Sequence, residues 1–161
     1  MSATPSTPEQ ELAVVIKEQL GNTVESVVAV DKGRISIIAG KEVARDIATW
    51  LQRFGFDHTL AVSGVDYPPE NRLDVVYLLA SYSRDDLKGM VMLLTIHLKR
   101  DSPTLPSLTP VWESANLFER ETYEMFGITF EGHPNLKKLL LQDNWDGPPP
   151  LRKDLKIPEM A

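Results

Sequence analysis

The sequence contains no cysteine, and this absence excludes several kinds of chemistry. Without thiols the chain forms no disulfide, supplies no thiolate to a zinc or iron–sulfur site, and has no cysteine nucleophile. Its three histidines, His58, His97 and His133, are too far apart in the sequence to form a local metal motif. We therefore expect no metal bound by this chain.

Long apolar runs and an excess of positive charge are also missing. The most apolar stretch, Met90–Ile96, has seven residues, whereas a membrane-spanning helix needs about 18. The segment Met1–Pro5 lacks the basic and then hydrophobic pattern of a signal peptide. The formal net charge of −6 argues against a nucleic-acid partner, because phosphate binding needs a basic face. We expect a cytoplasmic protein whose contact with a membrane is indirect.

Motifs for nucleotide binding and for serine nucleophiles are absent as well. The sequence has no G-x-G-x-x-G stretch and no G-x-S-x-G elbow. Gly40 and Lys41 look like the end of a phosphate loop, but Glu42 stands where Ser or Thr is required. We therefore expect no cofactor bound by this chain.

The composition is that of an ordinary globular domain, with 161 residues of which 42% are hydrophobic and 25% charged. Residues 1–6 are small and polar and are predicted to be disordered. Helical apolar spacing predicts helices over 7–20 and 43–54, each followed by a glycine. Strand-like segments lie at 24–30, 34–39, 59–65, 73–83 and 90–99. Their short links favour antiparallel neighbours, so we predict an α+β fold: a mostly antiparallel sheet with two helices on one face.

The C-terminal part of the chain has a different composition. Prolines at 103, 106 and 110 predict a stiff linker, and Thr109-Pro110 predicts the start of a third helix that ends at Gly127. Residues 132–161 predict an extended proline-rich arm without a core of its own. Residues 1–131 carry 12 Lys/Arg against 19 Asp/Glu, and the arm carries 5 against 4. An acidic body, 7–131, with a neutral-to-basic arm is typical of a docking protein.

The segment 119–137 resembles the signature of the respiratory complex I 30-kDa subunit, also called the C subunit of NADH-quinone oxidoreductase. The matching positions are Glu119, Arg120, Glu121, Glu124, Met125, Phe126, His133 and Lys137, and the likeness continues at Leu139, Leu140, Trp145, Arg152, Lys153 and Asp154. It covers about residues 112–156. The additional stretch 146–150 departs from the bacterial and chloroplast pattern and looks closer to archaeal deazaflavin-dependent or hydrogenase-related relatives.

The resemblance implies a scaffolding subunit in the peripheral arm of an ion-translocating complex that transfers electrons to a quinone. Its partners would be the large 49-kDa-like quinone-site subunit and the iron–sulfur subunits, with the membrane arm contacted indirectly. It implies a peripheral membrane protein on the cytoplasmic side of the cell membrane. Quinone, iron–sulfur clusters and the electron-donor cofactor would belong to neighbouring subunits. The donor could be NADH, ferredoxin or a reduced deazaflavin, and this chain would carry no catalytic residue.

The charged residues of the signature allow more than one interpretation. Helical steps of 100° direct Glu119, Arg120 and Glu121 in three directions. Arg120 and Glu124 are four residues apart and could pair, whereas Glu121 and Glu124 could bring two carboxylates together. They could form a solvated surface, a docking face or a catalytic pair. The resemblance favours docking and predicts an interface formed by Glu119, Arg120, Glu121, Glu124, His133, Lys137, Trp145, Arg152, Lys153 and Asp154.

Two alternative functions stay open. The chain could be an independent acid–base enzyme that uses Glu121, Glu124 and His133, or a free-standing adaptor that uses the arm on an unrelated partner. Trp145 could be anchored on its own domain or buried in a partner. Arg152 could bind a partner carboxylate through two hydrogen bonds.

Overall fold

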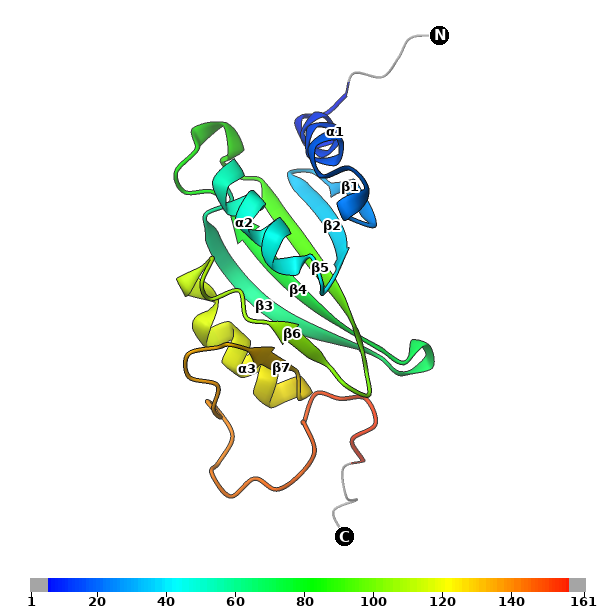
Figure 1. The fold of residues 1–161 in the computed structure, drawn as a ribbon, viewed down its shortest axis with the longest axis vertical. Helices are drawn as coiled ribbons and strands as arrows, with labels where there is room; N and C mark the ends of the chain where they lie inside the picture. Colours follow the sequence, from blue (N-terminus) through cyan, green and yellow to red (C-terminus); the bar gives the residue numbers. More distant parts are fainter. Residues whose placement is uncertain (1–5, 157–161) are drawn as a thin grey trace.

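A five-stranded mixed sheet with helices on one side forms the body of the protein (Figure 1). The structure, a computed structural model, describes residues 6–156. The disorder predicted for residues 1–6 therefore lies outside the described residues except at Ser6, whose hydroxyl donates to Glu11 at 2.5 Å. The elements in chain order are α1 (Pro8–Leu20), η1 (Gly21–Thr23), β1 (Ser26–Asp31), β2 (Arg34–Gly40), α2 (Ala44–Phe54), β3 (His58–Tyr67), η2 (Pro68–Glu70), β4 (Arg72–Ala80), η3 (Asp85–Leu87), β5 (Val91–Lys99), β6 (Thr104–Pro106), η4 (Glu113–Ala115), α3 (Asn116–Phe126) and β7 (Thr129–Glu131).

The strand order in the large sheet is β1-β2-β5-β4-β3. The pairs β1/β2, β5/β4 and β4/β3 are antiparallel, and β2/β5 is parallel. The predicted α+β fold is confirmed, and the sheet is mostly antiparallel as expected. The parallel pair differs from the prediction. It arises because the connection through α2 carries the chain from β2 to the far edge at β3, and β5 then returns between β2 and β4.

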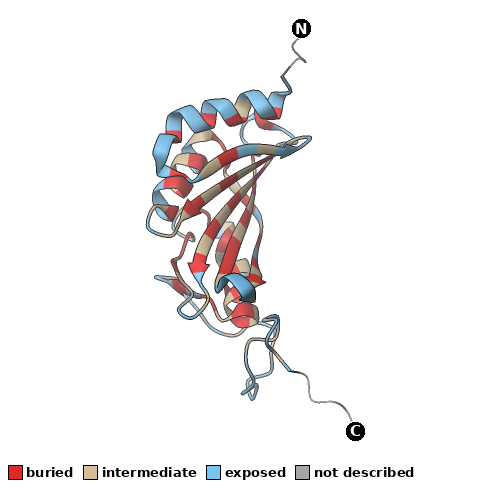
Figure 2. Ribbon diagram, turned by 90° about the vertical axis from the view of Figure 1, so that its right-hand side faces the viewer, coloured by how far each residue is buried: buried red, intermediate tan, exposed pale blue. Residues whose placement is uncertain are grey.

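The core lies between the sheet and the helices α1 and α2. Ile37, Leu94 and Tyr77 are register partners on neighbouring strands, and all three are fully buried. The apolar stripe of α2 buries Ile47 and Leu51 on the same side. Figure 2 shows both helices on one side of the sheet, as predicted. Their burial follows from the helical apolar spacing in the sequence.

The segment between the large sheet and α3 differs from the predicted linker and helix. Strand β6 pairs in parallel with β7, so part of the expected linker is a short strand. Helix α3 begins at Asn116 and not at Pro110, because the intervening turn buries Leu108 and Trp112. The Trp112 indole N–H donates to the carbonyl oxygen of Phe56 at 2.8 Å. This tertiary contact favours a turn where the local pattern predicted a helix.

Helix α3 packs so closely on β3 that Gly64 has no room for a side chain. A Cβ atom at Gly64 would lie 2.6 Å from the Phe126 ring. We expect Gly64→Ala to lower the free energy of unfolding by about 2 kcal/mol, because the ring must leave its position. Urea denaturation of both proteins measures the change. The control Ser63→Ala, at an exposed neighbouring position, should change it by less than about 0.5 kcal/mol. Equal effects of the two substitutions would contradict the close-packing argument.

Candidate functional site

Glu119 lies inside the domain and joins three parts of the fold. Its carboxylate accepts hydrogen bonds from the Tyr77 hydroxyl at 2.9 Å, the Ser107 hydroxyl at 2.6 Å and the Leu108 N–H at 2.8 Å. The side chain is fully buried. Burial raises the pKa of Glu119 above its ordinary value, although these hydrogen bonds and the nearby His133 act in the opposite direction. Glu119 therefore fixes α3 to β4 and to the turn at 107–108.

Arg120 and Glu124 lie on one face of α3, and both bind the backbone of the arm. Arg120 donates to the carbonyl oxygens of Lys137 at 3.2 Å and Lys138 at 3.0 Å. Glu124 accepts from the N–H groups of Leu140 at 2.8 Å and Leu141 at 2.7 Å. We call Arg120 and Glu124 the first anchor. The ion pair that their spacing allowed is not formed in the described structure, because each side chain already satisfies arm backbone groups.

Two opposing effects act on the pKa of Glu124. Burial alone would raise it, but the N–H groups of Leu140 and Leu141 outweigh burial and hold the pKa below its ordinary value. The nearby Lys138 acts in the same direction as the N–H groups. Glu124 is therefore an ionised carboxylate at neutral pH, suited to holding two arm amides.

Glu121 and His133 differ from the first anchor in what they contact. Glu121 is exposed, while Glu119 and Arg120 are buried. The sequence predicted only that these three side chains point in different directions. One ring nitrogen of His133, Nε2, lies 3.0 Å from the Asn116 carbonyl oxygen, and the other accepts from the Asn135 N–H at 3.0 Å. A cavity lies between α3 and the loop formed by residues 142–148. It is lined by Glu124 but not by Glu121 or His133. Glu124 and His133 are thus bonded to backbone groups, and no hydrogen bond in the described part of the chain joins either of them to Glu121.

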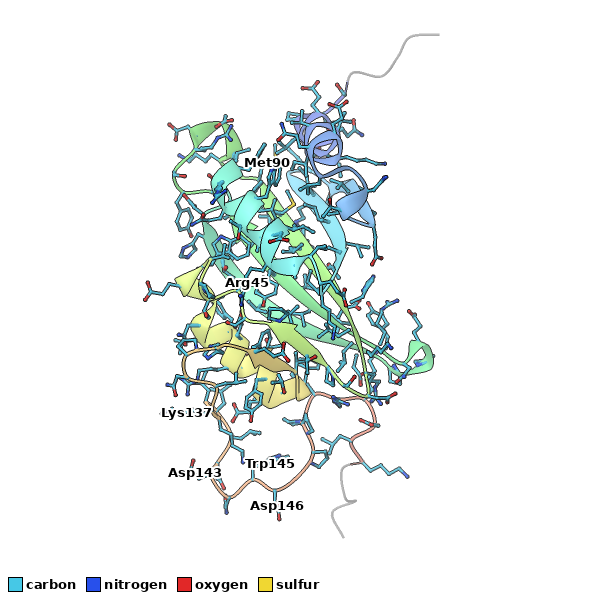
Figure 3. The ribbon with its side chains drawn as sticks, in the orientation of Figure 1. Arg45, Met90, Lys137, Asp143, Trp145 and Asp146 are labelled. Atoms are coloured by element: carbon cyan, nitrogen blue, oxygen red, sulfur yellow. The ribbon has the colours of Figure 1, made fainter. Side chains whose placement is uncertain are left out.

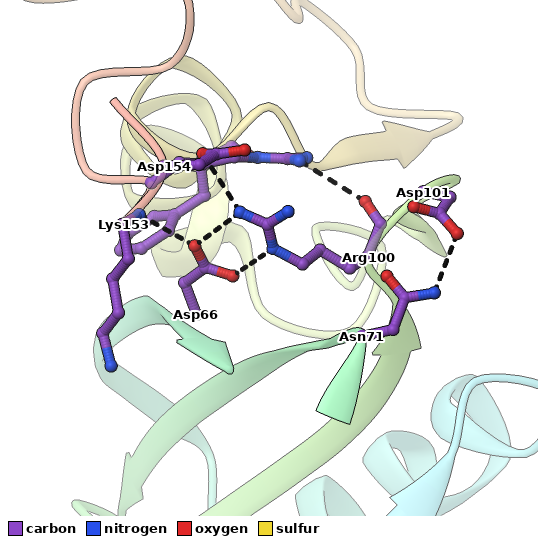
Figure 4. Close-up of polar contacts among 8 residues, drawn as sticks. Asp66, Asn71, Arg100, Asp101, Lys153 and Asp154 are labelled. Carbon is purple, nitrogen blue, oxygen red and sulfur yellow. Dashed lines mark hydrogen bonds and ion pairs between the residues drawn. The ribbon is translucent and has the colours of Figure 1, made fainter. Parts of the chain in front are cut away.

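The far end of the arm is held by an ion-pair cluster (Figure 4). Arg100 donates to Asp66 at 2.7 Å and contacts the Asp154 carboxylate at 3.0 Å. Asp66 also accepts from the Lys153 N–H at 2.9 Å. The Arg100 guanidinium lowers the pKa of Asp66, against the effect of burial. We call Asp66 and Arg100 the second anchor.

The arm also covers the C-terminal end of α3. Arg152 donates to the Phe126 carbonyl oxygen at 2.8 Å, and the Leu151 N–H donates to the Met125 carbonyl oxygen at 3.0 Å. A cation and an N–H group thereby satisfy carbonyls that a helix end leaves without intrahelical partners. Gly127 ends the helix with φ +69°, and a Cβ there would lie 2.8 Å from Pro149. Glycine is required at this position for both reasons.

The middle of the arm, residues 142–148, forms a loop away from the sheet (Figure 3). Trp145 donates from its indole N–H to the Pro148 carbonyl oxygen at 3.3 Å and remains 39% exposed. Lys138 donates to the Trp145 carbonyl oxygen at 2.6 Å. A cavity of about 220 Å³ separates the loop from α3. Trp145 therefore packs within the arm itself, and Figure 3 shows Asp143 directed away from the loop.

Four residues that organise this site had no recognisable signal in the sequence. Asp66 and Arg100 form the second anchor, and Tyr77 and Ser107 donate to Glu119. Asp66 was visible only as a polar residue next to an apolar strand segment, which by itself does not identify a partner residue.

Within residues 6–156 no cluster of three acidic or histidine side chains is placed to share a metal ion. In the same part of the chain, no helix combines the length and apolar character needed to cross a membrane.

Acidification should release the arm at both anchors. Asp66 and Glu124 have lowered pKa values in the folded chain, so each stabilises the folded arm above the ordinary carboxyl pKa. This contribution disappears as pH falls through their folded-state values, below about pH 4. We expect the amide proton and nitrogen shifts of Leu140 and Lys153 to move toward random-coil values in that window. In the Asp66→Asn variant the pH-dependent change of the Lys153 amide shifts should vanish, while the corresponding change at Leu140 remains. Loss of the native shifts of both amides already above the ordinary carboxyl pKa, or an unchanged pH dependence of Lys153 in Asp66→Asn, would contradict the assignment.

Comparison with known proteins identifies relatives for most of the chain. The family model for the respiratory-chain NADH dehydrogenase 30-kDa subunit matches residues 37–160. The C subunit of F(420)H(2) dehydrogenase from Methanosarcina mazei is 44% identical over 122 residues, which is 75% of each chain. The C subunit of NADH-quinone oxidoreductase from Chlorobium phaeobacteroides is 34% identical over 148 residues, covering 90% of this chain and 87% of the relative.

Two solved structures show the same fold. A trypsin-resistant fragment of Nqo5 superposes with a TM-score of 0.67 at 30% identity, covering 78% of this chain and 98% of the fragment. A chain of the membrane-bound sulfane sulfur reductase, an archaeal respiratory membrane complex, superposes with a TM-score of 0.79 at 22% identity, covering 91% and 85%. The predicted family is confirmed by the family model and by the curated relatives. The chain belongs to the family of the respiratory-chain NADH dehydrogenase 30-kDa subunit.

Proposed function

We propose that this chain is a cofactor-free scaffolding subunit in the peripheral arm of a complex I-type quinone oxidoreductase. The relatives named as C subunits of NADH-quinone oxidoreductase and of F(420)H(2) dehydrogenase support a place in such an electron-transferring complex. The chain would hold the 49-kDa-like quinone-site subunit beside the iron–sulfur subunits, on the cytoplasmic side of the membrane. Quinone, iron–sulfur clusters and the donor cofactor would be bound by these neighbours.

The observation that carries this proposal is the arm held at both ends. The two anchors hold residues 137–141 and 153–154, so both ends of the loop between them are fixed on its own domain. Ordering a segment before binding reduces the entropic cost of association. The arm nevertheless leaves four large apolar side chains exposed, Leu139, Leu140, Trp145 and Leu151. Exposed apolar side chains on a rigid support are typical of a protein interface.

The predicted interface residues fall into two groups in this proposal. The exposed ones, which would touch the partner, are Glu121, Lys137, Trp145, Lys153 and Asp154. The others would act indirectly by holding α3 and the arm in place, and these are Glu119, Arg120, Glu124, His133 and Arg152. A partner surface with a hydrophobic slot for Trp145 and charged groups of both signs around it would match this face.

Affinity purification from the native membrane fraction tests the proposal. The tagged chain should be recovered with a quinone-site subunit and iron–sulfur subunits. Trp145→Ala should reduce that recovery about tenfold, in line with an aromatic hot spot. The control Val14→Ala, at a 56% exposed position on α1, should leave recovery unchanged. Recovery of the wild-type chain without any of these subunits would refute the scaffolding function.

The electron donor of the assembly can be tested with the same preparation. The 44% identity to the C subunit of F(420)H(2) dehydrogenase favours a reduced deazaflavin as donor over NADH. The purified assembly should therefore oxidise reduced deazaflavin faster than NADH. Glu121→Gln should not change the turnover of the assembled complex, because a scaffold residue touches no reacting atom. Normal assembly with lost turnover would instead favour the acid–base alternative.

A further inference from the structure

The two edges of the large sheet differ in how the chain covers them. Strand β3 forms one edge and is bound by residues around α3. The Thr59 N–H donates to the Ser114 hydroxyl at 3.0 Å, and the Thr122 hydroxyl lies 3.2 Å from the Val62 carbonyl oxygen. Strand β1 forms the other edge, and within residues 6–156 it pairs with β2 alone. Figure 1 shows β1 at the rim of the sheet, beside α1.

The hydrogen bonds of β2 show which backbone groups of β1 point outward. Gly33, the residue before β2, accepts from the Val91 N–H of β5 at 2.8 Å. Ile38 accepts from the Glu25 N–H, next to β1, also at 2.8 Å. Because the backbone groups of successive strand residues point to opposite sides, odd-numbered residues of β2 bond to β5 and even-numbered residues bond to β1.

The same alternation applies along β1. Val28 is the register partner of Ser36, an even-numbered residue of β2, so Val28 bonds to β2. The N–H and C=O groups of Val27 and Ala29 therefore point away from β2, toward the free edge. Sheet edges are commonly protected by charged side chains or proline, but residues 26–30 contain neither. The register shift that follows Ala29 limits the regular edge to residues 26–29.

A groove lies between α1 and this edge. It has a volume of about 370 Å³, and its lining includes Ala13 and Lys17 of α1 and Val27 and Ala29 of β1. A second hollow of about 230 Å³ shares Gln10 and Ala29 with it and extends it toward the start of α1. When an extended peptide adds to a sheet edge, main-chain hydrogen bonds give the affinity and pockets for alternate side chains give the specificity. The edge of β1 supplies the first, and the groove supplies the second.

Charge indicates which strand would fit this edge. Residues 7–32 carry five Asp/Glu against two Lys, whereas residues 26–30 are uncharged. Val28 and Val30 are 48% and 53% exposed, so the edge is apolar in its middle. A complementary strand is apolar in its middle and carries Lys or Arg near its ends. A second copy of this chain does not meet this condition, because its own β1 region would bring a further excess of three carboxylates.

We propose that β1 binds an extended, basic-flanked segment of another subunit, which joins the sheet as an additional strand. Its main chain would bond to the outward groups of Val27 and Ala29, and alternate side chains would enter the groove beside Ala13. Both α1 and β1 precede residue 37, where the match to the family model begins, so this contact is separate from the arm. It rests on the proposed function because it needs a partner subunit.

Hydrogen exchange of the wild-type chain tests the added strand directly. In the isolated chain the amides of Val27 and Ala29 should exchange faster than that of Val28, which bonds to β2. In the assembled complex the exchange of Val27 and Ala29 should slow at least tenfold, as fragment mass spectrometry at single-residue resolution would show. Equal exchange in the complex and in the isolated chain would overturn the inference. Protection that appears in the isolated chain as its concentration rises would indicate a second copy and would also overturn it.

A proline at the edge separates main-chain pairing from side-chain docking. Ala29→Pro removes an outward N–H and leaves the hydrogen bonds between β1 and β2 in place, so the isolated chain should keep its unfolding midpoint. Recovery of the other subunits from the membrane fraction should fall at least tenfold. Ala29→Ser keeps the N–H and should assemble like the wild type. Val14→Ala trims another side chain of the groove but keeps every main-chain bond, so it should assemble as well.

The outcomes distinguish this contact from the scaffolding function. Normal recovery with Ala29→Pro, or lost recovery with Val14→Ala alone, would show that the main chain of β1 is not what the partner binds. If Ala29→Pro unfolds, the exchange experiment decides, because it uses the wild-type chain. If the wild-type chain is recovered with its subunits but the exchange is unchanged, only the added strand is wrong. If the wild-type chain is recovered alone, the scaffolding function is refuted, and the added strand with it.

Discussion

Replacement of Glu119 by alanine is expected to lower the free energy of unfolding by about 4 kcal/mol. The substitution leaves the Tyr77 hydroxyl, the Ser107 hydroxyl and the Leu108 N–H without their shared acceptor in the buried interior. Each unsatisfied buried donor costs about 1–3 kcal/mol, and the lost side chain adds a cavity. Urea denaturation at neutral pH, followed by circular dichroism, measures the change.

Two controls separate the carboxylate from its surroundings. Tyr77→Phe removes one of the three hydrogen bonds and should lower the free energy of unfolding by about 1 kcal/mol.

Because the pKa of Glu119 is raised in the folded chain, its ionised form is less favourable there than in the unfolded chain. The contribution of Glu119 to the free energy of unfolding should therefore decrease as pH rises through its folded-state pKa. The Glu119→Gln variant should lack this pH-dependent decrease. A loss below about 1 kcal/mol in the alanine variant would show that the network is dispensable.

Replacement of Glu124 by alanine is expected to release the first part of the arm and weaken binding to the partner subunits about 30-fold. Residues 137–141 lose the acceptor for the Leu140 and Leu141 N–H groups. The arm must then be ordered during association, which costs about 2 kcal/mol, equivalent to that factor. Hydrogen exchange of the isolated chain should show faster exchange at these two amides, and titration with the purified remaining subunits gives the affinity.

Glu121→Ala is the matched control on the same helix. It removes a carboxylate three residues away whose side chain is exposed, so the amides of the arm should exchange as in the wild type. Its effect on affinity should stay within about threefold, as for an exposed charge at the margin of an interface. If Glu124→Ala binds as tightly as the wild type, the arm does not need to be pre-ordered.

Local patterns in the sequence predicted most of the elements. The start of α1 was visible as Thr7, Pro8 and Gln10, and the Gln10 side chain does accept from the Thr7 N–H at 3.0 Å. The end of α2 at Gly55 and the hairpin between β1 and β2 were visible for similar reasons. These features depend on residues within a few positions of one another, which is why spacing alone identifies them.

Long-range partners could not be predicted in the same way. The parallel pairing of β2 with β5 joins segments separated by α2, β3 and β4, and the sequence carries no mark of that choice. Similarly, the four-residue spacing of Arg120 and Glu124 allowed an ion pair, but both bind backbone atoms of the arm. Backbone groups of a distant segment have no signature in the sequence.

The signature Glu-Arg-Glu segment illustrates this difference. Its density of charge suggested either a docking face or a catalytic pair. In the folded chain Glu119 is bound to the core, Arg120 is bound to the arm and only Glu121 faces solvent. Adjacent positions of one motif therefore serve the interior, the arm and the surface.

The central position of β5 also determines when the nascent chain can fold. A chain synthesised only as far as β4 has the β1–β2 and β3–β4 hairpins, but no strand joins them. The sheet closes only after residues 91–99 leave the ribosome, and the Glu119 contacts form later still. The two hairpins would expose their apolar edges until then, which makes this interval the stage most prone to aggregation. The contacts that α3 and the arm make with the sheet therefore form only after this interval has passed.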